Sequence, residues 1–126
     1  MSTRSGMIVL LGFVVLTGCG QTSTEDALQQ RPLSDVIAEA NELSNDGLER
    51  QARAYRDAVV KQNEELDRLK QTKRDLDYVE KTGPRAKELD KQMQVLGKSI
   101  GRLIERHRVY INRLHQKGLP TDGLEL

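Results

Sequence analysis

The only cysteine in this chain of 126 residues, Cys19, directly follows an apolar run and stands between two glycines. A single thiol excludes an intrachain disulfide and any metal site that needs several cysteines. What chemistry remains open to this thiol depends on the residues that precede it.

The other side chains that carry chemistry are not spaced for catalysis. His107 and His115 are eight positions apart instead of four, so they do not form a helical zinc-binding pair. We find no Ser/His/Asp set, no Gly-rich phosphate loop and no cofactor motif. The sequence therefore predicts no enzyme activity: no catalytic residue, no metal, no cofactor and no small-molecule substrate.

The N-terminal segment has the layout of a secretion signal. Residues 1–6 include Arg4, and residues 7–16 form an apolar run that is too short to span a membrane. A four-residue motif follows that resembles the lipobox of bacterial lipoproteins, in which an aliphatic residue, a small residue and Gly or Ala precede the modified Cys. The motif consists of Leu16, Thr17, Gly18 and Cys19.

The resemblance covers residues 1–19 only, and it implies an address for the protein. In that family the signal is cut directly before the cysteine, so residues 1–18 would be a signal peptide and Cys19 would carry acyl chains. The protein would then be anchored in the bacterial cell envelope, on the outer membrane facing the periplasm if the source is Gram-negative. A plain signal peptide, or an N-terminal helix with an incidental cysteine, is the alternative.

Composition favours long helices. The sequence holds 20 Lys and Arg, 19 Asp and Glu, one Phe, three Tyr and no Trp. So few aromatic residues argue against a thick globular core, and the mixture of aliphatic and charged residues is typical of amphipathic helices. Without residues 1–18 the two charge types balance, which argues against a nucleic-acid partner.

The segment after the cysteine divides into two predicted parts. Residues 19–32 are polar and lack a sustained period, which predicts a flexible lipidated tether. Ser34 is the predicted N-cap of a short helix that breaks at residues 44–47. The charged residues of segment 25–49 are almost all acidic, and those of segment 98–117 are almost all basic. This short helix is therefore expected to lie beside the end of the last helix.

Two heptad seams dominate residues 48–114 and predict an all-α fold. The first seam consists of Leu48, Ala52, Tyr55, Val59, Gln62, Leu66, Leu69, Lys73 and Leu76. The second consists of Ala86, Leu89, Met93, Leu96, Ile100, Leu103, His107, Tyr110 and Leu114.

The sequence between the seams decides how the two helices are connected. Gly83 suits the end of one helix and Pro84 the first position of the next, so we expect a tight turn at residues 82–84. The result is an antiparallel helical hairpin over residues 33–117, followed by a disordered tail over residues 118–126. One continuous helix with a local shift of phase is the alternative.

The hairpin register makes two further predictions. A turn at Gly83 and Pro84 places Tyr55 close to Tyr110, and it brings Gln62 level with His107. A buried polar pair would fix the register of the arms, whereas two side chains at the edge of a thin seam would reach solvent instead.

Two hypotheses on function follow. A two-helix hairpin buries little apolar surface, so it gains from self-association or from docking on another envelope protein. We therefore expect a membrane-anchored lipoprotein whose coiled coil is a structural or interaction module. The alternative is a membrane-tethered, holdase-like chaperone or carrier that binds clients on exposed apolar faces.

Overall fold

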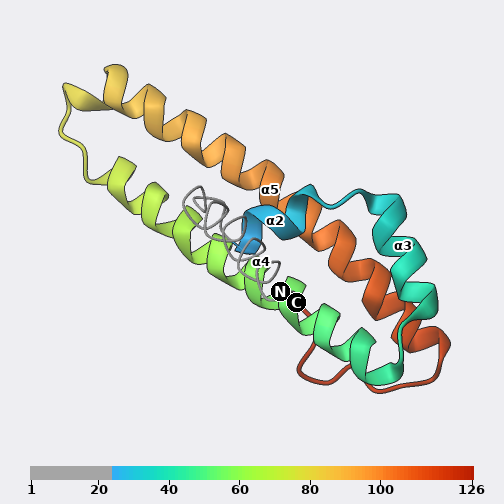
Figure 1. The fold of residues 1–126 in the computed structure, drawn as a ribbon. Helices are drawn as coiled ribbons and strands as arrows, with labels where there is room; N and C mark the ends of the chain where they lie inside the picture. Colours follow the sequence, from blue (N-terminus) through green and yellow to red (C-terminus); the bar gives the residue numbers. More distant parts are fainter. Residues whose placement is uncertain (1–23) are drawn as a thin grey trace, which may run out of the picture.

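The computed structural model describes residues 24–126, and this part of the chain is all-α, as predicted (Figure 1). The elements are α2 (Thr24–Gln30), α3 (Leu33–Glu42), α4 (Asn45–Arg74), the short 3₁₀ helix η1 (Glu80–Thr82) and α5 (Pro84–Gln116). The predicted signal peptide and Leu16, Thr17, Gly18 and Cys19 lie outside the described residues.

Helices α4 and α5 are the two arms of an antiparallel hairpin, which confirms the predicted architecture (Figure 1). The tight turn at residues 82–84 is wrong, however, because α4 already ends at Arg74 and residues 75–83 form the connection, which we call the tip. Within it, an Asp77 carboxylate oxygen accepts a hydrogen bond from the Glu80 amide at 2.8 Å and starts η1. Pro84 is the first residue of α5, as expected, whereas Gly83 is the N-cap of α5 instead of the end of α4.

Residues 24–30 form helix α2, so the prediction of a flexible tether over residues 19–32 is wrong for this part. The helix lies across both arms: Glu25 pairs with Lys61 of α4 at 3.5 Å, and Gln29 accepts a hydrogen bond from Arg102 of α5 at 3.0 Å. These polar contacts, together with Leu28, hold the helix on the arms, so the segment folds without a heptad period in its sequence.

Helix α3 packs along α5 through Val36 and Ala40, both fully or almost fully buried. Its expected place beside the end of α5 is confirmed, but Ser34 is not its N-cap, since the helix follows Pro32 and has no side-chain cap. The expected break lies at residues 43–44. There the Ser44 hydroxyl accepts a hydrogen bond from the Gly47 amide at 3.1 Å and caps α4.

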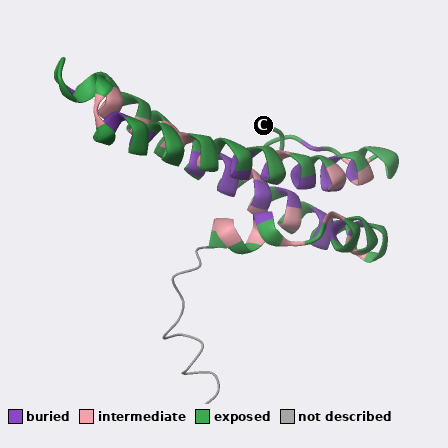
Figure 2. Ribbon diagram, turned by 90° about the horizontal axis from the view of Figure 1, so that it is seen from above, coloured by how far each residue is buried: buried purple, intermediate pink, exposed green. Residues whose placement is uncertain are grey.

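The buried residues form two separate clusters (Figure 2). The larger lies in the half of the hairpin away from the tip, where α2 and α3 make a second layer, and we call this the proximal half. The smaller consists of Leu76, Ala86 and Leu89 near the tip. Between the clusters the predicted seam residues are only half-buried, namely Leu66, Leu69, Met93 and Leu96. In the proximal half the structure buries Leu48, Ala52, Tyr55, Val59, Gln62, Ile100, Leu103, His107, Tyr110 and Leu114.

The C-terminal tail folds back onto the arms, so the prediction of disorder over residues 118–126 is wrong. Gly118 adopts a φ of +72°, and the amides of Gly118 and Leu119 donate to the carbonyls of His115 and Leu114, both at 3.0 Å. This pair of bonds is the Schellman motif, which reverses the chain after a helix. The reversal brings Leu124 into the large cluster with 1% of its surface exposed.

We predict that Leu124→Ala lowers the free energy of unfolding by about 2 kcal/mol, because it removes a buried side chain from the core. The matched control is Leu126→Ala, two residues further on, where the side chain is 59% exposed and the expected change is under about 0.5 kcal/mol. Urea denaturation followed by circular dichroism measures both. Equal, negligible effects of the two substitutions would mean that the tail does not pack.

Candidate functional site

A stacked pair of tyrosines lies at the centre of the proximal half. The ring centroids of Tyr55 from α4 and Tyr110 from α5 are 5.6 Å apart, and neither side chain is exposed. The proximity predicted from the hairpin register is thus confirmed. Burial raises the pKa of both phenols, so both hydroxyls stay protonated and act as hydrogen-bond donors at neutral pH.

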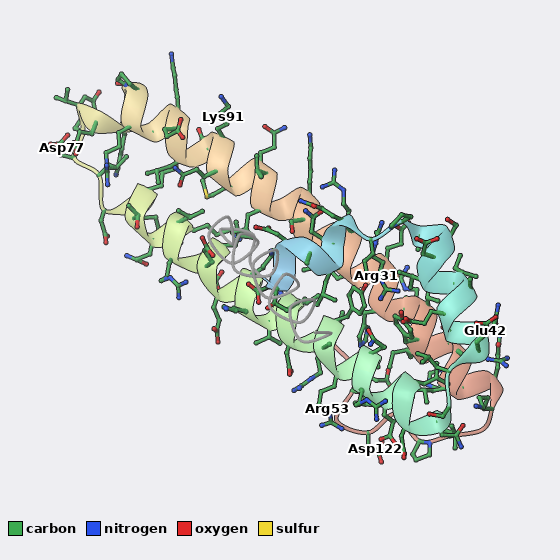
Figure 3. All side chains as sticks on the ribbon, in the orientation of Figure 1. Arg31, Glu42, Arg53, Asp77, Lys91 and Asp122 are labelled. Atoms are coloured by element: carbon green, nitrogen blue, oxygen red, sulfur yellow. The ribbon has the colours of Figure 1, made fainter. Side chains whose placement is uncertain are left out.

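Helix α2, helix α3 and the connection between them supply the partners of these hydroxyls. Tyr55 donates to the Leu28 carbonyl at 3.3 Å, and Tyr110 donates to a Glu39 carboxylate oxygen at 2.6 Å. Arg31, which is labelled in Figure 3, donates to both phenol oxygens at 3.5 and 3.3 Å and pairs with Glu39 at 3.3 Å. We call Arg31, Glu39, Tyr55 and Tyr110 the clasp, because they join all four α-helical segments.

The clasp is closed and has a structural role. Arg106 of α5 donates from Nε to the Arg31 carbonyl at 2.8 Å and so fixes the α2–α3 connection as well. Each of the four clasp side chains has a partner in another segment of the protein, and none of the four lines the groove described next. The chemistry available here is that of a buried hydrogen-bond network that holds α2 and α3 on the arms.

Beyond α2 the same face of the hairpin is uncovered and forms a groove between the arms, with a volume of about 480 Å³. Its apolar lining comes from Leu69, Val95 and Leu96, and Val95 is 64% exposed. Two buried polar atoms also belong to lining residues and have no hydrogen-bond partner within the described chain, Gln62 Oε1 and Ser99 Oγ. Each of these side chains is 6% exposed.

Charged side chains surround this groove on all sides. Asp26 and Glu65 lie on the side of α2 and α4, and Lys91 and Arg102 on the side of α5 together with Glu88. The groove thus combines an apolar floor, unpaired buried acceptors and a rim of both charges. These are the features of a surface for a helix or an extended segment, because a small molecule would need a more enclosed and more apolar pocket.

The predicted meeting of Gln62 and His107 does not occur. His107 faces the C-terminal tail, where its Nε2–H donates to the Leu124 carbonyl at 2.6 Å. Gln62 instead lines the groove with Ser99.

Several residues of the site escape prediction from the sequence. Arg31 and Glu39 carry the clasp, and Ser99 is buried on α5 at a position outside the predicted seam. A buried serine on a seam's flank leaves no mark in the sequence. Arg31, in contrast, is the one basic residue of the acidic segment 25–49, and this isolated positive charge is a usable signal.

The described residues hold no group of three or more His, Cys, Asp or Glu that could bind a metal ion. None of the helices from Thr24 onward is long and apolar enough to cross a membrane. No protein-family model matches the chain, and no characterised protein or solved structure is significantly similar to it.

We predict that His107 makes the protein less stable in mild acid. Burial lowers the pKa of its imidazole from the ordinary 6.5, and the nearby Arg56 and Arg108 act in the same direction, against the Leu124 carbonyl and Glu125. Below that ordinary value the unfolded chain binds a proton that the folded protein binds only at lower pH. The contribution is therefore complete above pH 6.5 and is lost as the pH falls through it.

Urea midpoints measured at several pH values from neutral to mildly acid test this prediction. His107→Gln, which keeps a donor for Leu124, should reduce the loss of stability on acidification. His115→Gln is the control, since this histidine is exposed and its imidazole hydrogen-bonds with Thr121 of the tail at 3.2 Å. An identical pH dependence in His107→Gln and the unsubstituted protein would contradict the assignment.

Proposed function

We propose that the protein is a lipoprotein of the bacterial cell envelope, anchored through acyl chains on Cys19, and that its hairpin is a non-catalytic interaction module. The docking site is the groove between the arms, and its partner is an amphipathic helix of another envelope protein. The observation that carries the proposal is the uncovered groove with its two unpaired buried polar atoms.

The proximal half indicates what kind of partner the groove suits. There the same face of the arms is covered by α2 and α3, which are short amphipathic helices, and its buried hydroxyls all have partners (Figure 2). The half of the hairpin toward the tip, which we call the distal half, has an equivalent face without a covering helix. A partner helix would bury Leu69, Val95 and Leu96.

The charges on the rim of the groove indicate which charges a partner helix carries on each of its two edges. Basic residues on the helix edge that faces Glu65 of α4, and mainly acidic residues on the edge that faces Lys91 and Arg102 of α5, would complement the groove. A helix with the opposite arrangement would meet like charges at these three residues, with Glu88 as the one acid on the α5 side. The groove therefore favours one orientation of a partner helix over the reverse.

The position of α2 bears on the orientation of the anchored protein. A flexible tether that enters the hairpin at its open end would let both arms run straight away from the membrane. Because Glu25 pairs with Lys61, near the middle of α4, the chain that leads from Cys19 reaches the hairpin at mid-length instead. An anchor there leaves both ends of the hairpin at comparable distances from the attachment point.

We predict that Cys19→Ser removes the lipid and releases the protein from membranes. Without the thiol there is no site for the acyl chains whose burial, at about 0.8 kcal/mol per CH₂, would hold the protein in the bilayer. Mass spectrometry of the mature protein and membrane fractionation of a bacterial host are the measurements. An unsubstituted protein that starts at another residue or carries no acyl group would refute the anchor.

We predict that a photoreactive amino acid at Val95 crosslinks to the partner in native membranes. Val60 is the matched control, since it is also an exposed valine, at 44% against 64%, but does not line the groove. Leu69→Asp should abolish the Val95 adduct by placing a charge on the groove floor. An adduct of twice the protein's mass would identify a second copy as the partner, and equal labelling from both positions would contradict a groove-specific site.

A further inference from the structure

Two adjacent apolar side chains project from the tip of the hairpin. Tyr78 is 89% exposed and Val79 is 77% exposed, the two highest values among the large hydrophobic residues exposed in the described chain. Water-exposed neighbours of this kind at the end of a long hairpin are costly without a function, because a charged residue would serve the connection as well.

The tip is a built structure that presents this pair outward. The Asp77 side chain caps η1 at the Glu80 amide, and the Lys81 amide donates to the Asp77 carbonyl at 3.0 Å. Leu76, directly before it, is buried against α5 (Figure 3, where Asp77 marks this end). The buried Leu76 on one side and η1 on the other fix Tyr78 and Val79 on the outer surface.

A basic hollow with a volume of about 400 Å³ adjoins the tip and includes Lys81, two residues after Val79. Its lining consists of Lys70, Lys73, Arg74, Lys81 and Met93. Lys73 pairs with Asp90, and Arg74 donates only to neutral Gln71 and not to an acid, whereas Lys70 and Lys81 form no ion pair within residues 24–126. Residues 70–87 carry six Lys or Arg and three Asp or Glu, and two of these acids accept hydrogen bonds, Asp75 from Gln71 of α4 and Asp77 from the Glu80 amide.

We propose that the tip is a membrane-contact site that takes an anionic phospholipid surface. Tyr78 and Val79 enter the boundary between headgroups and acyl chains, where tyrosine is favoured, and the lysines and arginine of the basic hollow bind lipid phosphates. The shape favours a bilayer over a protein: the apolar pair is convex and small, and it would need a matching cavity on a protein, whereas a fluid interface accepts it directly.

The anchor and the tip can reach the same membrane. Five residues from Cys19 to Thr24 span at most about 18 Å. From Lys61, where α2 meets α4, to Arg74 at the end of the arm is about 20 Å along the helix. This last step rests on the proposed lipid anchor, whereas the affinity of the tip for anionic lipid does not.

A single-tryptophan reporter at the tip tests the proposal, because the full chain contains no tryptophan. The full-length protein with Tyr78→Trp is reconstituted into phosphatidylcholine vesicles and into vesicles that also contain phosphatidylglycerol. We expect blue-shifted emission, and quenching by brominated acyl chains, only where phosphatidylglycerol is present, with reversal at high salt. Val60→Trp on the side of α4 is the control and should emit like a water-exposed indole in both.

Charge reversal provides the second arm of the test. Lys70→Glu with Lys81→Glu should weaken the anionic-lipid response of the Tyr78→Trp reporter at least about tenfold. Lys98→Glu with Lys117→Glu changes the net charge equally on exposed residues away from the tip and should leave that response intact. Co-flotation with neutral vesicles reports the anchor separately. Emission from the tip reporter that is the same on both vesicle types, or equal effects of the two double variants, would overturn the proposal.

Discussion

The fold depends on the need of two buried phenols for hydrogen-bond partners. Tyr55 and Tyr110 stack with no exposed surface, and a buried hydroxyl without a partner costs about 1–3 kcal/mol. Two helical arms cannot supply partners on their own, because their backbone groups are used within the helices. Leu28, Arg31 and Glu39 supply them instead, which explains why the chain before α4 folds onto the arms instead of trailing from them.

The distal half of the hairpin has no helices packed on it as α2 and α3 pack on the proximal half. It lacks a buried aromatic residue, and its seam leucines between the two clusters, Leu66, Leu69 and Leu96, are only half-buried. Gln62 and Ser99 each leave an unpaired atom at its border. Regions with few buried contacts open at lower free energy than the core, so the distal half is the part of the hairpin that a partner can stabilise most. Docking there would extend to the whole hairpin the two-layer packing that the proximal half already has.

The sequence predicts the features that depend on regular periodicity. The heptad seams lead to the two arms, Pro84 to the start of α5, and the antiparallel pairing to the contact of Tyr55 with Tyr110. The features that depend on single polar contacts escape prediction. Helix α2 lacks a period because partners far away in the chain, on α4 and α5, hold it, and no local pattern reveals such partners.

Two of the wrong predictions, for the C-terminal tail and for the turn, concern segments whose sequence does contain a signal for the observed structure. Gly118 followed by Leu119 is the pattern of a Schellman motif with its apolar contact, yet the short polar tail suggests disorder. At the tip, the Gly-Pro pair draws the predicted turn to residues 82–84, although Asp77 before η1 already has the composition of a cap. The groove is not predictable from the seams, because its lining also includes residues of α2, a helix that the sequence does not predict.

The two proposed contacts are compatible because they use different residues of the distal half. On α4 the groove is lined by Gln62, Glu65 and Leu69, and the basic hollow by Lys70, Lys73 and Arg74. The two sets share no residue, and the one α5 residue of the basic hollow, Met93, does not line the groove. Lipid bound at the tip and the basic hollow therefore leaves the groove residues available to a partner helix. A partner can then dock while the tip holds lipid, so the two contacts can act together.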